Sequence, residues 1–172
     1  MCGIAGILSP DSIPLDAPIQ RMQIALQHRG SDDQGIYISP NHQAALAHTR
    51  LAILDLSPAG HQPMSTHDGR YHITFNGEIY NFQALRSQLI QQGEIFCSQT
   101  DTEVILKLYQ RVGSNCIKQL RGMFAFAIWD DQAACLTEAE RYKGYDQILD
   151  ALLNIHYVRC ISLPMIGEKS PR

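Results

Sequence analysis

Cys2 directly follows the initiator methionine in the run Met1-Cys2-Gly3-Ile4-Ala5-Gly6-Ile7. A small side chain at position 2 permits removal of Met1, after which the thiol and a free α-amine would share one carbon atom. A free α-amine has a pKa of about 7.7–8.0 and a free thiol one of about 8.5, so the amine can accept the thiol proton near neutral pH. The pattern predicts a nucleophile with its own general base. The alternative is a small apolar residue at the start of a buried strand.

Three further positions have residue types that suit such a nucleophile, and each has an alternative. Asn76-Gly77 offers an amide donor and an approachable backbone N–H for an oxyanion, although Asn-Gly also favours a hairpin turn. Arg50 lies in a mainly apolar segment and fits a carboxylate, or else a structural ion pair or a position at the strand's rim. Asp101 can bind an ammonium group, or it is an acid that the helix dipole favours in a first turn.

These motifs together resemble the glutaminase domain of class II glutamine amidotransferases, and within that class the domain of glutamine-hydrolysing asparagine synthetases. The resemblance covers residues 1–132, and residues 133–172 form a divergent tail. It rests on motifs in the family's order: Cys2-Gly3-Ile4-Ala5-Gly6, His28-Arg29-Gly30, His48-Thr49-Arg50-Leu51-Ala52-Ile53, Gly60-His61-Gln62-Pro63-Met64, Phe75-Asn76-Gly77-Glu78-Ile79-Tyr80-Asn81, Thr100-Asp101-Thr102-Glu103 and Arg121-Gly122-Met123-Phe124-Ala125-Phe126.

The resemblance implies an α+β fold of the N-terminal nucleophile hydrolase type, a four-layer αββα sandwich of mainly antiparallel sheets. It also implies catalytic roles for Cys2, Asn76 and Gly77: Cys2 attacks the side-chain amide of L-glutamine, while Asn76 and the Gly77 N–H hold the oxyanion. Arg50 then binds the substrate carboxylate and Asp101 its ammonium group. The remaining pocket residues implied in this way are Leu51, Ile53, Leu54 and Glu78.

Hydrophobic periodicity predicts the elements that position these residues. A helix is expected for residues 16–28, a second over Phe82–Ile90, and a third after the capping-box pattern Thr100-Asp101-Thr102-Glu103. Strands are expected over Ile4–Leu8, Ile36–Ser39, Ala44–Ala52, Tyr71–Asn76 and Met123–Trp129. The last of these is apolar on both faces, which indicates a strand covered by layers above and below.

Composition excludes several other classes of protein. A net charge of −3 gives no reason to expect nucleic acid as a partner, and no apolar run approaches the roughly 20 residues of a membrane span. The five scattered cysteines predict neither a disulfide framework nor a zinc site, which is typical of a reduced, cytoplasmic protein. The seven histidines show no metal-binding spacing and are expected on the surface or in loops.

Two departures from the family pattern lie within the chain. Ser31 stands where the family usually has proline, which loosens that loop's backbone. After residue 132 the family's continuing strands are not recognisable, so we expect a second sheet that is truncated, with an open edge beside Met123–Trp129. An amphipathic pattern from Tyr145 to Leu153 predicts one helix in the tail.

The expected function is therefore hydrolysis of L-glutamine to glutamate and ammonia, as the glutaminase part of an asparagine synthetase-type enzyme whose synthetase part is missing here. Hydrolysis itself requires no cofactor or metal, and ATP and Mg are expected only for the missing synthetase domain. One alternative is a truncated, non-catalytic fragment. Another is a stand-alone glutaminase that supplies ammonia to a separate synthetase subunit; a homodimer is a further expected arrangement.

Overall fold

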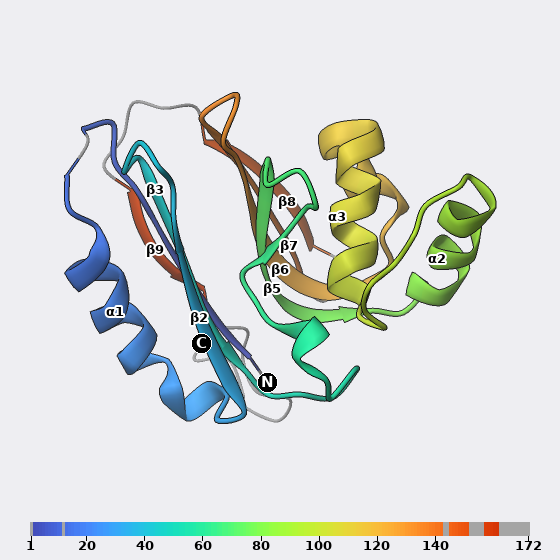
Figure 1. Ribbon diagram of the computed structural model, residues 1–172, viewed down its shortest axis with the longest axis horizontal. Coiled ribbons are helices and arrows are strands. Elements are labelled where there is room, and N and C mark those ends of the chain that lie inside the picture. The colour runs from blue at the N-terminus through green and yellow to red at the C-terminus, as the bar shows by residue number, and fades with distance from the viewer. Residues whose placement is uncertain (1, 12, 143–144, 152–156, 162–172) are drawn as a thin grey trace.

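In the computed structural model, two antiparallel sheets face each other, with helices on the outer face of each (Figure 1). The structure describes residues 2–11, 13–142, 145–151 and 157–161. Helix α1 (Asp16–Ala25) covers the first sheet, whereas α2 (Phe82–Gln91) and α3 (Asp101–Val112) cover the second. The layers thus follow the order helix, sheet, sheet, helix, which confirms the predicted four-layer αββα fold.

The first sheet has the strand order β2–β3–β1–β9. Its strands are β1 (Gly3–Leu8), β2 (Asp33–Ile38), β3 (Ala44–Arg50) and β9 (Tyr157–Ile161). Every residue of β3 is buried, because α1 packs on one face of this sheet and the second sheet packs on the other. The register places Gly3 opposite Thr49, so the start of β1 lies beside the end of β3. Cys2 and Arg50 are brought to the same edge of the molecule in this way.

The second sheet has the strand order β4–β5–β6–β7–β8. Its strands are β4 (Met64–Ser65), β5 (Tyr71–Ile79), β6 (Gly122–Asp130), β7 (Cys135–Tyr142) and β8 (Tyr145–Ala151). The two faces of β6 are both covered, as its apolar run predicts: Phe124 and Phe126 belong to the core beneath α3, and Trp129 to the core between the sheets. Strand β4 pairs with β5 only through Met64 and Ser65, so in the described sheet the edge of β5 after Ile73 has no neighbouring strand.

Several predicted elements are present with shifted ends. The helix predicted for residues 16–28 ends at Ala25 and is followed by a 3-10 helix, Gln27–Arg29; further 3-10 helices are Pro58–Gly60 and Gly113–Gln119. The strand expected from Ile36 begins at Asp33. The strand expected to end at Asn76 continues to Ile79, so the hairpin-turn alternative for Asn76-Gly77 is wrong. Pairing with β6 across this dipeptide overrides its turn preference.

The tail differs most from the sequence-based expectation. Tyr145–Ala151 is a strand, not part of a helix, and residues 152–153 lie outside the described residues. Strand β7 pairs with β6 along seven residue pairs, so the expected open edge beside β6 is not found. Strand β9 joins the first sheet beside β1. Helical spacing of apolar residues was misleading here, because an unpaired strand edge offers backbone hydrogen bonds that periodicity does not reveal.

Candidate active site

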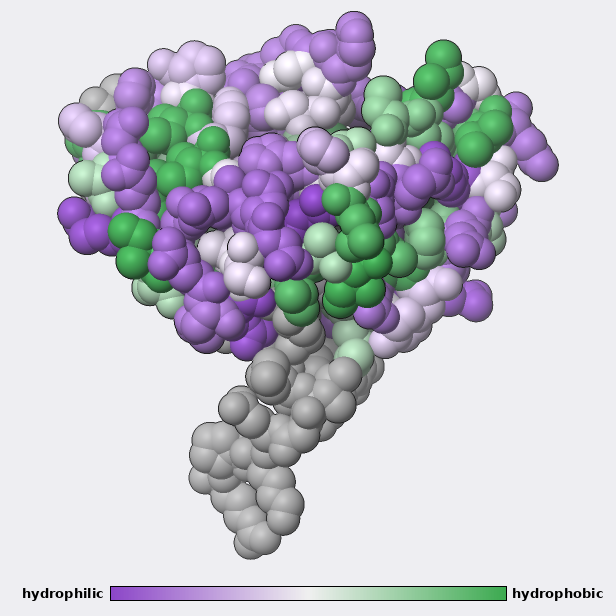
Figure 2. All heavy atoms as spheres, turned by 60° about the horizontal axis from the view of Figure 1, so that its bottom comes forward, coloured by the Kyte–Doolittle hydropathy of each residue, from purple (hydrophilic) through white to green (hydrophobic). Residues whose placement is uncertain are grey.

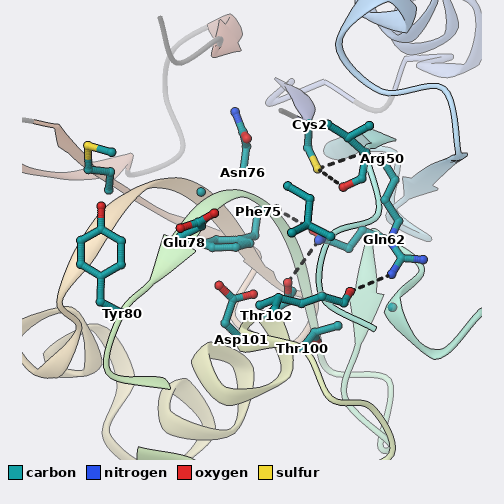
Figure 3. A pocket seen from close by; sticks show the side chains of 16 residues that line it. Cys2, Arg50, Gln62, Phe75, Asn76, Glu78, Tyr80, Thr100, Asp101 and Thr102 are labelled. Carbon is teal, nitrogen blue, oxygen red and sulfur yellow. Dashed lines mark hydrogen bonds between the residues drawn. The ribbon is translucent and has the colours of Figure 1, made fainter. Parts of the chain in front are cut away.

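A cavity lies between the start of β1, the segment 51–60 that follows β3, the edge of β5 and the N-terminal end of α3 (Figure 3). Its volume of about 260 Å³ is smaller than the roughly 300–1,000 Å³ of pockets for drug-sized ligands, which suits a substrate as small as one amino acid. The structure brings all nine predicted site residues to this cavity. They are Cys2, Arg50, Leu51, Ile53, Leu54, Asn76, Gly77, Glu78 and Asp101.

Cys2 lies directly before β1, with its side chain at the cavity wall. Its Sγ is 3.6 Å from the carbonyl oxygen of Leu51, which accepts the thiol hydrogen, and 3.4 Å from the Leu51 nitrogen, which donates to sulfur. Burial raises the pKa of the thiol above its ordinary value. The thiol therefore stays protonated at neutral pH and requires a base before it can act as a nucleophile.

The free edge of β5 directs backbone donors toward the cavity. In an antiparallel strand, residues two apart point their N–H groups to the same edge. The N–H of Phe75 donates to Gln62 Oε1 at 2.7 Å, and the N–H of Ile79 donates to Asp101 Oδ2 at 3.1 Å. The N–H of Gly77, between them, faces the same edge. The N–H groups of Phe75 and Ile79 thus donate to side chains, and Gly77 lies between them and lines the cavity.

Asn76 and Gly77 have the properties of an oxyanion-binding pair. Asn76 is 2% exposed, and its Nδ2 has no hydrogen-bond partner within the described part of the chain. A buried amide without a partner is costly, so this arrangement favours a ligand that accepts from it. Gly77 has φ 152°, and a Cβ there would collide with the backbone of Met123 and Phe124. Only glycine brings the backbone this close to β6.

Arg50 ends β3 and is 7% exposed. Its guanidinium donates to the carbonyl oxygens of Ser57 (Nη1, 3.2 Å), Leu54 (Nη2, 3.4 Å) and Asp55 (Nη2). These contacts are backbone hydrogen bonds and not the ion pair that one alternative proposed. Gly60 makes room for the group, because a Cβ there would collide with Nη2. The arginine therefore organises the segment 54–57 while lining the cavity.

Asp101 is the first residue of α3 and is 4% exposed. Burial raises its pKa from about 3.8 to about 6, although the backbone N–H groups of Ile79 and Thr102 favour the ionised form. Thr100 caps the helix by accepting from the Glu103 N–H at 3.2 Å. The other half of the capping box is not formed, since the Glu103 carboxylate accepts from the backbone of Cys97 and Ser98. Asp101 thus presents a carboxylate that a cationic group would stabilise.

Apolar side chains surround the cavity mouth. Leu51, Ile53 and Leu54 are 37%, 63% and 38% exposed. Figure 2 brings the lower side of Figure 1 forward and shows hydrophobic side chains gathered beside a hydrophilic area. The side chains of Arg50, Glu78 and Asp101 therefore lie among largely apolar groups. Electrostatic contacts with a ligand are stronger there than in water, because the local dielectric constant is lower.

Seven residues of the cavity were not predicted as site residues. Gln62 and Thr102 belong to motifs that carried the resemblance, but their types alone assign them no chemistry. The full set is Gly60, Gln62, Phe75, Tyr80, Thr100, Thr102 and Met123.

The expectation that every histidine lies on the surface or in loops is wrong for His48 (1% exposed) and His72 (6%), which belong to strands β3 and β5. Both histidines lie within strands predicted from the sequence, Ala44–Ala52 and Tyr71–Asn76, and this pattern was the signal that could have indicated their burial.

Two absences concern only the part of the chain that the structure describes. No group of three or more histidine, cysteine, aspartate or glutamate residues there is arranged to hold a metal ion. No helix in these ranges is both long enough and apolar enough to cross a membrane.

Comparison with known proteins decides the family. The family model for a glutamine amidotransferase domain matches residues 1–142. The chain belongs to the glutamine amidotransferase family. The match extends ten residues beyond the predicted domain boundary at 132 and takes in β7; the boundary itself stays a prediction.

Relatives place this amidotransferase domain with the asparagine synthetase type. It is 42% identical to a relative from Methanocaldococcus jannaschii over 146 residues, 76% of this chain and 28% of that protein, whose name describes a glutamine-hydrolysing asparagine synthetase. It is 39% identical over 156 residues to asparagine synthetase B, glutamine-hydrolysing, of Escherichia coli, covering 86% of this chain and 27% of the relative. The chain thus spans about a quarter of the length of these relatives.

A solved structure supports the fold independently. The glutamine phosphoribosylpyrophosphate amidotransferase of Bacillus subtilis, complexed with ADP and GMP, superposes with a TM-score of 0.65. The superposition covers 81% of this chain and 37% of that one, at 24% sequence identity. The amidotransferase domain described here therefore has the N-terminal nucleophile hydrolase fold that its motifs predicted.

Proposed function

We propose that this domain hydrolyses L-glutamine to glutamate and ammonia with Cys2 as nucleophile. The observation that carries the proposal is the convergence of four groups around one small cavity: a thiol, a buried amide without a partner among the described residues, a guanidinium and a carboxylate. Glutamine presents the complementary groups: a side-chain amide, an α-carboxylate and an α-ammonium. Family membership adds that glutamine is the nitrogen source.

The proposed reaction begins once Met1 has been removed. The α-amine of Cys2 accepts the thiol proton, and the sulfur attacks the side-chain carbonyl carbon of glutamine. Negative charge then develops on the carbonyl oxygen, where Asn76 Nδ2 and the Gly77 N–H donate to it. Collapse of the tetrahedral intermediate breaks the carbon–nitrogen bond. The protonated amine returns its proton to the departing nitrogen, which leaves as ammonia.

A water molecule completes the proposed cycle. The neutral α-amine removes a proton from water, whose oxygen attacks the thioester carbon. The carbon–sulfur bond then breaks, the protonated amine returns the proton to the sulfur, and glutamate and free Cys2 are released. Arg50 binds the substrate carboxylate and Asp101 its ammonium group, so both ends of the amino acid are held while the amide reacts. Leu51, Ile53, Leu54 and Glu78 line the pocket around it. The chemistry uses only these residues and water, with no metal or nucleotide.

The decisive test follows glutamate and ammonia during incubation of the purified chain with L-glutamine. We expect turnover by the natural chain and loss of at least about 10³-fold in Cys2→Ala. Cys97→Ala is the matched control, because Cys97 is an exposed cysteine that does not line the cavity. Equal rates in the natural chain and Cys2→Ala would contradict the proposal. Intact mass must also show Met1 removed, since a retained Met1 blocks the α-amine.

A second proposal concerns the fate of the ammonia. The names of the relatives lead us to propose that it serves asparagine synthesis, in a synthetase part that would use ATP and Mg. Such a part would act as a separate subunit or as further chain, and the proposed site of action is the cytoplasm. Asparagine formation from aspartate, ATP and 15N-amide glutamine, in an extract that contains the natural chain, would test it. Loss of the label in a Cys2→Ala extract is expected.

A further inference from the structure

The backbone of Phe75 is held by two side chains instead of a neighbouring strand. Pairing of β4 with β5 ends at Ile73, and Phe75 is the next residue whose N–H and C=O point to the same edge. Gln62 Oε1 accepts from the Phe75 N–H at 2.7 Å, and His48 Nε2 lies 3.1 Å from the Phe75 carbonyl oxygen. A carbonyl oxygen only accepts, so His48 must carry its hydrogen on Nε2.

Both side chains are anchored in separate elements. Gln62 is 6% exposed, and its Nε2 donates to Thr102 Oγ1 in α3 at 3.2 Å (Figure 3). His48 is 1% exposed and belongs to β3 in the opposite sheet. Burial lowers the pKa of its imidazole to about 4, so the ring is neutral at physiological pH. Phe75 is thus connected at once to the first sheet and to the helix that begins with Asp101.

We propose that His48 and Gln62 are positioning residues for the oxyanion donors of the proposed glutaminase reaction. They hold the peptide units on either side of Phe75, directly before Asn76 and Gly77. Rotation of those units would swing the Asn76 amide and tilt the Gly77 N–H. Oxyanion donors act only within about 0.5 Å of the productive geometry, so small rotations matter. The inference rests on the proposed function and adds two residues to it.

Gln62→Met and His48→Leu test this directly, because each keeps a side chain of similar size and removes its contact with Phe75. The oxyanion exists only in the transition state, so we expect kcat to fall about 10–100-fold with KM within about two-fold. His48→Gln should recover most of the loss, since the glutamine Nε2–H can donate where the imidazole Nε2–H did. A role in pocket shape would instead raise KM.

Thr74→Val is the matched control. Thr74 is 1% exposed and donates to the Ala47 carbonyl oxygen at 3.1 Å, so its loss also removes a buried contact between β5 and β3. The Thr74 hydroxyl bonds to Ala47 and not to the N–H or C=O of Phe75. We expect a lower melting temperature and an unchanged kcat for this variant.

Amide hydrogen exchange at Phe75 provides a readout that does not depend on turnover. We expect faster exchange in Gln62→Met, which loses the acceptor, than in the natural chain and Thr74→Val. An inactive natural chain would overturn the proposed function, and this inference with it. An active natural chain whose kcat is unchanged in folded Gln62→Met and His48→Leu would overturn only the positioning roles. Circular dichroism melts establish that each variant is folded.

Discussion

The two walls of the cavity are held in place by different means. On one side, Asn76 and Gly77 lie within β5, whose nine residues all pair with β6, and Asp101 begins a buried helix. On the other side, the segment 51–57 between β3 and the 3-10 helix Pro58–Gly60 has no backbone ladder. It is held by the Arg50 guanidinium and by Asp55, whose carboxylate accepts from Ser57 and from the Gln99 N–H at 2.7 Å.

The difference separates two tasks. The proposed oxyanion donors lie on paired, buried backbone, which allows little movement. The proposed contacts that admit and enclose the substrate lie on a segment organised by side chains, where opening costs less. Changes in the strand wall, meaning Asn76 and Gly77 of β5, should therefore lower kcat. Changes in the loop wall, meaning Arg50 and the segment 51–57, should mainly raise KM.

Gly77→Ala is expected to have the largest effect. Its Cβ would meet the backbone of Met123 and Phe124 at φ 152°, so β5 must move away from β6. We expect loss of measurable glutamate formation and a melting temperature lower by 10 °C or more, for a cost of about 3 kcal/mol. Gly69→Ala is the control: its φ is also positive, at 70°, but a Cβ there meets nothing within 4 Å. Similar melting temperatures for both variants would contradict the claim that a Cβ at Gly77 forces β5 away from β6.

Asn76→Ala should follow, with the fold intact. Removing one oxyanion donor costs about 10²–10³-fold in kcat. Because the buried Nδ2 has no partner in the described structure, stability should not fall and KM should change little. Steady-state kinetics and a thermal melt measure both. A rise in KM with unchanged kcat would show that Asn76 binds the ground state instead.

Arg50→Lys is the corresponding test of the loop wall. Lysine keeps the charge but loses the planar fork that reaches the carbonyl oxygens of Leu54, Asp55 and Ser57. We expect KM for glutamine to rise about 10–100-fold with a much smaller change in kcat. Arg70→Lys, at an arginine that pairs with Asp130 away from the cavity, should leave KM unchanged. An equal loss in kcat would remove the distinction between the two walls.

The pH dependence of kcat/KM tests Asp101. Its pKa is raised to about 6, so acidification through pH 6 protonates the carboxylate and removes the charge that would bind the substrate ammonium. The α-amine, with a pKa of about 7.7–8.0, must also be neutral. The logarithm of kcat/KM should fall with slope one below about pH 7.7 and with slope two below about pH 6. In Asp101→Asn the lower break should disappear; its persistence would assign it to another group.

Asp55→Asn should have the smallest effect. The asparagine keeps one acceptor oxygen and loses either the contact with Ser57 or that with Gln99. We expect KM to rise about two- to five-fold at constant kcat, because one hydrogen bond is lost from an exposed segment. Asp68→Asn, in a remote turn where Asp68 accepts from Thr66, is the matched control and should not change KM. A lower kcat in Asp55→Asn would show that the loop wall also acts in the chemical step.

Much of the fold was predictable from local pattern. The strand at Met123–Trp129, the helix after Thr100 and the helix from Phe82 are all present, because their apolar spacing and the Thr100 cap determine local structure directly. The ordered motifs identified nine residues as site residues, and all nine line the cavity. The tail strands were missed, because strand pairing depends on an edge formed by distant residues.

The proposed positioning roles could not be predicted from the sequence, for a different reason. His48 and Gln62 are separated by 14 positions, and nothing in their spacing links either residue to Phe75. Their common property is contact with the polar groups of Phe75, which exists only after β3 and β5 have been placed in facing sheets. The Asn76 Nδ2, which has no hydrogen-bond partner among the described residues, is likewise a result of packing.

The sequence by itself determined which chemical groups are available: a cysteine that removal of Met1 can expose, an amide–glycine pair, a guanidinium and a carboxylate in the family's order. Tertiary structure decided that these groups share one small cavity, that Asn76-Gly77 is strand instead of turn, and which side chains hold it there. Residue type and spacing specify chemistry and local conformation, whereas convergence depends on long-range pairing that no local pattern contains.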